Sequence, residues 1–258
     1  MPRVAADPRR TRPPAADVTV ATPARAATFR SMSDANAGKR AAAHAAADLV
    51  RTDTIIGLGT GSTFAFVIDR LAERVRNEKL RIAGVPTSKA TADLAAKAGI
   101  PLRELDDVPG LDLAIDGADE VDPKKNLIKG GGGAHVRERM VAVLAKELVV
   151  IVDDKKLVPV LGKAFQLPVE VLQFGWQQTR RRVAATGCAP ALRQKNGAPF
   201  VTDNGNYVLD CKFAGIADPA ALAQRLDAMV GVVDHGLFVG MAGRVIVGDA
   251  RGTVRVIA

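Results

Sequence analysis

The stretch TIIGLGTGSTF, residues 54–64, passes from an apolar, β-branched run into a turn of glycines and hydroxyl side chains. β-branched residues favour strands, whereas serine and threonine are typical of the residue that starts a helix. We therefore predict a strand over 54–59 and a helix over 62–76. A strand that leads directly into a helix is half of a β-α-β unit, the unit from which parallel sheets are built.

The same alternation continues on both sides of this stretch. Its apolar runs have few polar interruptions, which is typical of strands buried on both faces. We therefore expect an α/β fold with a mainly parallel sheet that is covered by helices on both faces. The predicted helices are 36–50, 88–98 and about 134–147, and the predicted strands are 80–85, a short strand after Pro101, 111–116 and 148–154.

The pattern changes after about residue 163. A strand (PVEVLQF), a helix over about 176–186, strands around the Asn-Gly turn of VTDNGNYVLDCKF and a helix over 218–229 predict a small α+β layer. The last two β-branched runs, RVIVGD and TVRVIA, are predicted to return to the first sheet.

Residues 1–31 have a composition unlike the rest of the chain. They are rich in proline, arginine and alanine, without hydrophobic periodicity, so we expect a disordered leader. Arginine and hydroxyl residues fit a transit peptide, but two aspartates argue against one. Alternatively, Met32 is the true start of the protein.

The overall composition predicts a soluble, cytoplasmic protein that does not bind nucleic acid or membranes. Hydrophobic residues make up 48% of the chain, enough for a core, but no apolar run approaches the roughly 18 residues of a membrane span. Half of the net charge of +8 lies in residues 1–31, and aromatic residues for base stacking are few. The two cysteines and three histidines lack the spacing of a disulfide framework or a metal site, so we expect no metal.

The turn after the first strand predicts an anion-binding site. Backbone N–H groups at a helix start attract anions, and Thr60, Ser62 and Thr63 add hydroxyl donors around Gly61. A dinucleotide site is disfavoured because Ser62 stands where the third glycine of G-x-G-x-x-G belongs and no acid ends the second strand. Lys89 keeps an NADP site as an alternative, and a purely structural glycine turn is another.

A second polar stretch, AIDGADEVDPKKNLIKGGGGAHVRERM (114–140), follows a predicted strand. Asp116 falls at the carboxyl end of that strand, where α/β sheets bind ligands, and Asp119 lies three residues further on. Lys129 precedes four glycines, whose cost in conformational entropy suggests that the backbone approaches something polar, such as a polyol. Turn-forming aspartates, and Glu138 as a residue that only favours the helix dipole, are the simpler alternatives.

Several motifs, in order, resemble the type A ribose-5-phosphate isomerase family. They are GLGTGST (57–63), DGADEVD (116–122), KGGGGAHVRER (129–139) and VDDKKLVPVLG (152–162), with PVEV, VTDNGN and GVVDHGLF beyond them. The resemblance spans roughly residues 34–258. It implies a three-layer α/β/α Rossmann-like catalytic domain (32–162 and 240–258) and a small α+β, ferredoxin-like lid region (163–239).

The resemblance also implies an activity: the interconversion of ribose 5-phosphate and ribulose 5-phosphate without metal or organic cofactor, by a homodimer or homotetramer. Glu138 is then the base that moves a proton between C2 and C1, Asp116 and Asp119 hold sugar hydroxyls and assist ring opening, and Lys129 stabilises the enediolate. The implied substrate-binding residues are Lys39, Thr60, Gly61, Ser62, Thr63, Gly117, Ala118, Gly130, Gly131, Gly132 and Lys156. VDDKK departs from the usual family motif, which leaves Lys155 as the alternative to Lys156.

Three other functions are compatible with this architecture. A sugar-phosphate sensor of a transcription regulator would need a DNA-binding module, and residues 1–31 are too short and too rich in proline to form a helix-turn-helix. The others are an isomerase of a different sugar phosphate, for example an amino sugar, and a CoA transferase. The aspartate pair with Lys129 favours a hydroxyl-rich aldose.

Overall fold

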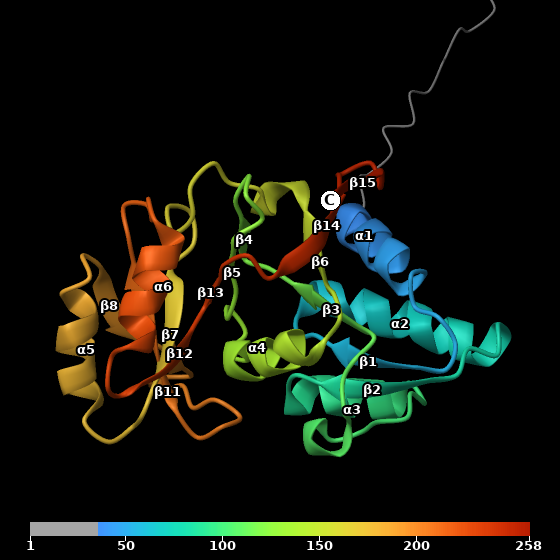
Figure 1. Ribbon diagram of the computed structural model, residues 1–258, viewed down its shortest axis with the longest axis horizontal. Helices are drawn as coiled ribbons and strands as arrows, with labels where there is room; N and C mark the ends of the chain where they lie inside the picture. The colour runs from blue at the N-terminus through green and yellow to red at the C-terminus, as the bar shows by residue number, and fades with distance from the viewer. Residues whose placement is uncertain (1–35) are drawn as a thin grey trace, which may run out of the picture. The chain divides into compact units, whose positions relative to one another are not determined.

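The main sheet has six strands, and the TIIGL run forms one of its inner strands. The computed structural model describes residues 36–258 (Figure 1). The sheet order is β15-β14-β6-β3-β1-β2; every neighbouring pair is parallel except the antiparallel β14–β15. The strands are β1 (Thr54–Leu58), β2 (Ile82–Pro86), β3 (Leu113–Gly117), β6 (Leu148–Asp153), β14 (Ala242–Gly248) and β15 (Val254–Ile257). The predicted α/β class, the mainly parallel sheet and the return of the last two strands are confirmed.

Both faces of this sheet are buried because alternate side chains of each strand pack into different cores. On β6, Val149 and Ile151 pack with the helices α1 and α2, whereas Val150 and Val152 pack with Val141 of α4. Each fully buried aliphatic side chain contributes roughly 1.5–3 kcal/mol to stability. The helices are α1 (Ala37–Ala47), α2 (Ser62–Asn77), α3 (Lys89–Lys97) and α4 (His135–Leu144).

A second sheet has four antiparallel strands in the order β12-β7-β11-β8. With two helices it forms the chain order β-α-β-β-α-β of the ferredoxin-like fold, as predicted. Its elements are β7 (Leu167–Val171), α5 (Trp176–Ala184), β8 (Ala189–Leu192), β11 (Tyr207–Lys212), α6 (Pro219–Asp227) and β12 (Val232–His235). A short hairpin, β9 (Gln194–Lys195) and β10 (Ala198–Pro199), turns at Asn196 and Gly197, both of which have positive φ.

A third, three-stranded sheet was not predicted. It consists of β13 (Leu237–Phe238), β5 (Leu127–Ile128) and β4 (Glu120–Val121), and it links the two larger sheets (Figure 1). Within β5, Leu127 packs into the core of the main sheet and Ile128 into the core of the four-stranded sheet. Strands of two residues are too short to show alternation in a sequence.

The predicted element boundaries differ from the structure in several places. The strand expected after Pro101 is reduced to one bridge between Leu102 and Gly84, and the short helices η1 (Leu105–Asp107) and η2 (Asp154–Lys156) were not predicted. The helix predicted to end at 147 ends at Leu144 because Ala145 is extended.

The described residues 36–258 belong to one compact unit, and the domain boundaries at 162–163 and 239–240 stay a prediction. The predictions for residues 1–31 and for Met32 as the start lie outside the described residues. Within the described part, every helix is too short or too polar to cross a membrane.

Candidate active site

The two polar loops identified in the sequence meet in one cavity of about 150 Å³ at the carboxyl ends of β1 and β3. Fourteen of the fifteen predicted site residues line it; Asp116 lies directly behind them against Lys129. The lining residues are Lys39, Thr60, Gly61, Ser62, Thr63, Gly117, Ala118, Asp119, Lys129, Gly130, Gly131, Gly132, Glu138 and Lys156. A larger cavity of about 620 Å³ is lined by Asp122, Lys124 and Asp218 among others but by none of the predicted site residues, so we place the site in the smaller one.

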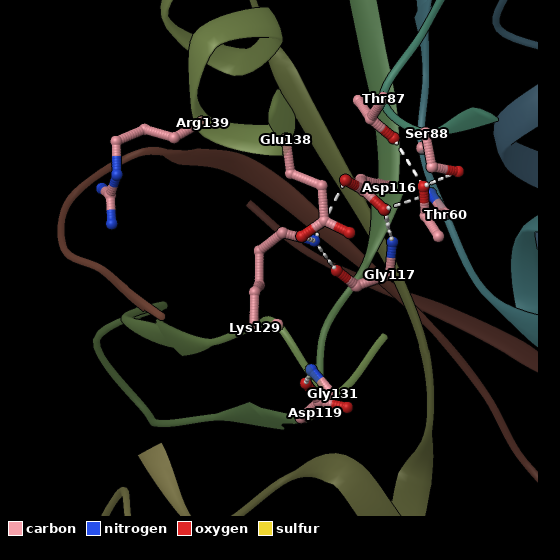
Figure 2. Close-up of polar contacts among 12 residues, drawn as sticks. Thr60, Thr87, Ser88, Asp116, Gly117, Asp119, Lys129, Gly131, Glu138 and Arg139 are labelled. Carbon is pink, nitrogen blue, oxygen red and sulfur yellow. Dashed lines mark hydrogen bonds and ion pairs between the residues drawn. The ribbon is translucent and has the colours of Figure 1, made fainter. Parts of the chain in front are cut away.

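Three buried charges from three different elements form the centre of the site (Figure 2). Lys129 Nζ lies 3.1 Å from Asp116 Oδ2 and 3.2 Å from Glu138 Oε2, and it also donates to the carbonyl oxygen of Gly117. Asp116 is the last residue but one of β3, Lys129 follows β5, and Glu138 lies in the first turn of α4. Their exposed fractions are only 3%, 3% and 6%. Water therefore screens these charges little.

The buried charges shift each other's pKa. Burial lowers the pKa of Lys129, but the charges of Asp116 and Glu138 outweigh it and raise that pKa to about 12. Burial, together with the charge of Asp116, raises the pKa of Glu138 to about 8, and Lys129 only partly opposes this. Among the described residues, Oε2 of Glu138 accepts no aligned hydrogen bond. Glu138 is thus a carboxylate that can take up a proton near neutral pH.

The first loop holds Asp116 in place through backbone groups. Asp116 Oδ1 accepts hydrogen bonds from the N–H groups of Thr60 at 3.1 Å and Gly117 at 2.7 Å. Gly59 must be glycine, because a β-carbon there would lie 2.3 Å from the same oxygen. These contacts fix one oxygen of Asp116 and leave the other facing Lys129.

The four-glycine loop is shaped by protein groups that approach its backbone closely. The N–H of Gly131 donates to Asp119 Oδ2 at 2.7 Å, and a β-carbon on Gly131 would collide with the same carboxylate. Gly130 and Gly133 have positive φ, and a β-carbon on Gly130 would lie 2.6 Å from the His135 ring. Polar protein groups, Asp119 and His135 among them, therefore approach the backbone of this loop closely, which agrees with the expectation from the four glycines.

The other end of the cavity offers donors and cations. Lys39 on α1 reaches Ser62 Oγ at 3.4 Å, next to the start of α2 at Gly61 (φ 114°). Lys156 of η2 lines the cavity, whereas Lys155 is exposed and is not among the described lining residues. A helix start flanked by two lysines is a typical site for a phosphate group.

Comparisons with known proteins agree with this geometry. Residues 83–252 match the family model of ribose 5-phosphate isomerase A (phosphoriboisomerase A). The ribose-5-phosphate isomerase A of Synechococcus sp. (strain JA-3-3Ab) is 51% identical over 86% of this chain and 97% of its own. The chain belongs to the ribose 5-phosphate isomerase A family.

Solved structures of this family share the fold. Ribose 5-phosphate isomerase from Plasmodium falciparum superposes with a TM-score of 0.83 at 39% identity, covering 85% of this chain and 97% of that one. A D-ribose-5-phosphate isomerase in complex with phospho-erythronic acid gives a TM-score of 0.82, also at 39% identity, covering 85% and 96%. The predicted family, the Rossmann-like fold and the isomerase class are thereby confirmed.

In this member of the ribose 5-phosphate isomerase A family, a hydroxyl cluster next to the first loop was missed by sequence reasoning. The hydroxyl of Thr60 lies 2.7 Å from that of Thr87, 2.9 Å from that of Ser88 and 3.2 Å from that of Thr91. Its methyl carbon lies on the side of Gly132. The Thr60 hydroxyl thus secures the loop against α3. The sequence carries a signal for this cluster, because TSKAT, shortly after the predicted strand 80–85, holds three hydroxyl side chains.

The helix that carries Glu138 is anchored by its neighbour. Figure 2 shows Arg139 pointing away from Glu138. Its Nε lies 2.8 Å from both carboxylate oxygens of Asp234, and its Nη2 donates to the carbonyl of Leu237 at 3.0 Å. Three groups come close enough to share an ion: Asp227, Asp234 and His235. Because Asp234 is already paired with Arg139, we interpret this cluster as an anchor for α4.

Proposed function

We propose that this chain interconverts D-ribose 5-phosphate and D-ribulose 5-phosphate through an enediolate, with Glu138 as the base that moves a proton between C2 and C1. The observation that carries the proposal is the buried Asp116–Lys129–Glu138 cluster at one end of a cavity whose other end is a helix start with two lysines. Family membership supports the same reaction.

The cavity suggests how the substrate lies. The phosphate group binds at the start of α2, with Ser62, Thr63, Lys39 and Lys156 around it. The sugar chain then extends along Gly117, Ala118 and the glycine loop, with its hydroxyls toward Asp119. This direction brings C1 and C2 to Glu138.

The raised pKa of Glu138 suits a carboxylate that must both take and return a proton. In its ionised form Glu138 removes the C2 proton of the open-chain aldose, and in its protonated form it delivers that proton to C1, while the hydroxyl proton on O2 moves to O1. A base with a pKa of about 8 holds the proton more tightly than an ordinary carboxylate. One residue on one face of a planar enediolate is enough for both steps.

Lys129 stabilises the intermediate by following the negative charge. Its ammonium group faces Asp116, Glu138 and the Gly117 carbonyl. When Glu138 takes the proton it becomes neutral, and the negative charge passes to the substrate oxygen. The Lys129 ammonium group, 3.2 Å from Glu138 Oε2, then donates to that oxygen, in a buried site where such a contact is strong.

The aspartates handle O–H protons. Asp119 is half-buried, lines the cavity and is held through one oxygen by Gly131. We infer that it holds sugar hydroxyls and, with Asp116, moves the hydroxyl proton that must transfer when the furanose ring opens. These acid-base steps use side chains alone, so the proposal includes no metal or organic cofactor.

We also infer a homodimer or homotetramer, located in the cytoplasm. The lid region exposes Leu172, Phe174 and Val230, with exposed fractions of 48%, 95% and 78%, which is unusual for a surface without a partner. Both cysteines are free thiols, as expected in a reducing compartment. Light scattering coupled to size-exclusion chromatography measures the assembly state.

The deciding experiment is incubation of the purified protein with ribose 5-phosphate in EDTA, with ketose formation followed over time. We expect conversion at undiminished rate in the chelator. Binding of ribose 5-phosphate without conversion would instead identify a sugar-phosphate sensor. Conversion only of an amino-sugar phosphate would identify a different isomerase.

A further inference from the structure

One arginine of the lid region reaches the four-glycine loop. Arg193 lies between β8 and β9, and its Nη1 donates to the carbonyl oxygens of Gly130 at 2.9 Å and Gly131 at 3.2 Å. Both glycines line the cavity. Nothing in the activity described above uses this contact.

The guanidinium of Arg193 is held in a fixed orientation. Its Nε donates to Asp210 Oδ2 at 2.9 Å, and its Nη2 donates to the other oxygen of the same carboxylate. Asp210 belongs to β11, an inner strand of the four-stranded sheet, and the two side chains are only 13% and 10% exposed. The Phe200 ring packs against Gly133 and lies 5.7 Å from the guanidinium. A two-point ion pair on an inner strand leaves the arginine little freedom to turn.

This contact determines which way two peptide groups point. In a trans peptide the carbonyl oxygen and the following N–H point in opposite directions. Because Arg193 holds the oxygen of Gly130, the N–H of Gly131 points to the other side, where Asp119 accepts it at 2.7 Å (Figure 2). Because it also holds the oxygen of Gly131, the N–H of Gly132, a residue that lines the cavity, points away from the arginine.

Glycine peptides need such an external constraint. Without a β-carbon, a glycine crosses between backbone conformations at little cost. Within the run, the N–H of Gly133 donates to the carbonyl oxygen of Gly130 at 2.9 Å, and Arg193 adds its contacts to the carbonyls of Gly130 and Gly131. A rotated peptide would turn a carbonyl oxygen into the cavity, where its partial negative charge would repel an enediolate. The same rotation would release Asp119 from Gly131.

We propose that Arg193 is a positioning residue: from the lid region it fixes the glycine loop so that the Gly132 N–H faces the substrate oxygen that becomes negative and the Gly131 N–H holds Asp119. The proposal rests on the isomerase function proposed above. It makes the lid region part of the catalytic apparatus although Arg193 does not touch the substrate.

The test compares three variants with a matched control. Arg193→Met removes the guanidinium, Arg193→Lys keeps a charge but cannot form the two-point contact, and Asp210→Asn weakens the orientation of the arginine. Arg244→Met is the control, because Arg244 forms a similar two-point ion pair with Glu147 at the opposite edge of the main sheet. For each protein, kcat and KM for ribose 5-phosphate are measured in EDTA.

Two inhibitors separate positioning from general damage. Phospho-erythronic acid carries a negatively charged, planar carboxylate that resembles the enediolate end, whereas erythritol 4-phosphate has the same phosphate and hydroxyls without that charge. We expect Arg193→Met to lower kcat by about 10²-fold, the loss typical of one missing oxyanion donor. The same substitution should weaken the binding of phospho-erythronic acid at least about tenfold more than the binding of erythritol 4-phosphate. Arg193→Lys and Asp210→Asn should fall between this variant and the wild type, and Arg244→Met should match the wild type.

Other outcomes overturn the proposal. The proposal is wrong if Arg193→Met keeps the kcat of the wild type. It is also wrong if the substitution weakens the binding of both inhibitors equally, which would indicate loss of structure. If Arg193→Met does not fold, the inhibitor ratio of Asp210→Asn decides in its place. If the wild type converts no ribose 5-phosphate, the proposed function fails, and the inhibitor ratio alone still decides whether Arg193 orients the loop.

Discussion

The two ends of the cavity bind charge in different ways. At the acid end, Asp116, Lys129 and Glu138 are almost fully buried, and each charge has a charged partner within 3.2 Å. At the phosphate end, Lys39 and Lys156 are only half-buried, and within residues 36–258 Lys39 makes one weak polar contact, at 3.4 Å to Ser62 Oγ. The acid end is therefore held together by its own ion pairs, whereas the lysines of the phosphate end can bind an anion.

This difference predicts different consequences of mutation. A buried charge that loses its partner keeps its desolvation cost, so a change at the acid end affects stability as well as chemistry. A half-buried lysine is still screened by water and salt, so a change at the phosphate end should affect affinity rather than stability. The predictions below test this division, beginning with the largest effect.

Replacing the base should give the largest loss of activity. We expect Glu138→Gln to lower kcat by about 10²–10⁴-fold with little change in KM, because it removes the proton acceptor but keeps the shape of the side chain. Steady-state kinetics with ribose 5-phosphate measure both constants. Glu73→Gln on the exposed side of α2 is the control and should behave as wild type. Near-normal turnover of the Glu138 variant would remove Glu138 from the mechanism.

Removing the buried cation should cost stability. Lys129→Met leaves Asp116 and Glu138 facing each other without a positive charge, which should lower the free energy of unfolding by about 3–5 kcal/mol, as for other broken buried ion pairs. Denaturant unfolding at neutral pH measures this change. Lys156→Met serves as the control from the phosphate end, and its stability should remain unchanged. Equal stability of the two variants would contradict the division.

A pair of adjacent lysines tests the phosphate end. We expect Lys156→Ala to raise KM about tenfold, corresponding to about 1.4 kcal/mol, with kcat nearly unchanged. Lys155→Ala should leave KM unchanged, because Lys155 is exposed and outside the cavity lining found in the described chain. The difference should shrink in high salt. A larger effect at Lys155 would assign the phosphate contact to that residue instead.

Much of the fold could be predicted because its strands are long enough to show their pattern. The runs at 55–58 and 148–152 are apolar throughout, which identified strands of a sheet that is covered on both faces. The two-residue strands Glu120–Val121 and Leu127–Ile128 have no detectable period. Leu127–Ile128 pairs with Leu237–Phe238, more than a hundred residues further along the chain, and no local pattern signals such pairing.

The candidate site was predictable where loops follow strands, because parallel strands bring their carboxyl ends together. That rule placed Asp116 and the 60–63 loop at one edge of the sheet. It could not identify Arg193, which belongs to the other sheet and meets Gly130 across 63 residues of sequence. Nor could spacing choose between Lys155 and Lys156, since the short helix Asp154–Lys156 determines which side chain turns inward.

The smallest expected effect is a shift of the pH profile, and it shows how far the acid end extends. Glu138 acts as a base only when ionised, and burial with the charge of Asp116 raises its pKa to about 8, so kcat/KM should fall as pH decreases below that value. Removing a neighbouring negative charge favours ionisation. Asp116→Asn should therefore move the acidic limb to lower pH, and Asp119→Asn should move it less, because Asp119 contributes least to the shift.

The position of the limb is independent of how far each substitution lowers the maximal rate, so both variants can be compared after normalising kcat/KM to its plateau. Asp93→Asn, on the exposed side of α3, controls for the loss of a distant carboxylate and should leave the limb in place. A limb that stays fixed in Asp116→Asn would mean that the proton acceptor is not coupled to the buried cluster. A larger shift in Asp119→Asn than in Asp116→Asn would mean that Asp119, at the cavity wall, is the closer electrostatic partner of the base.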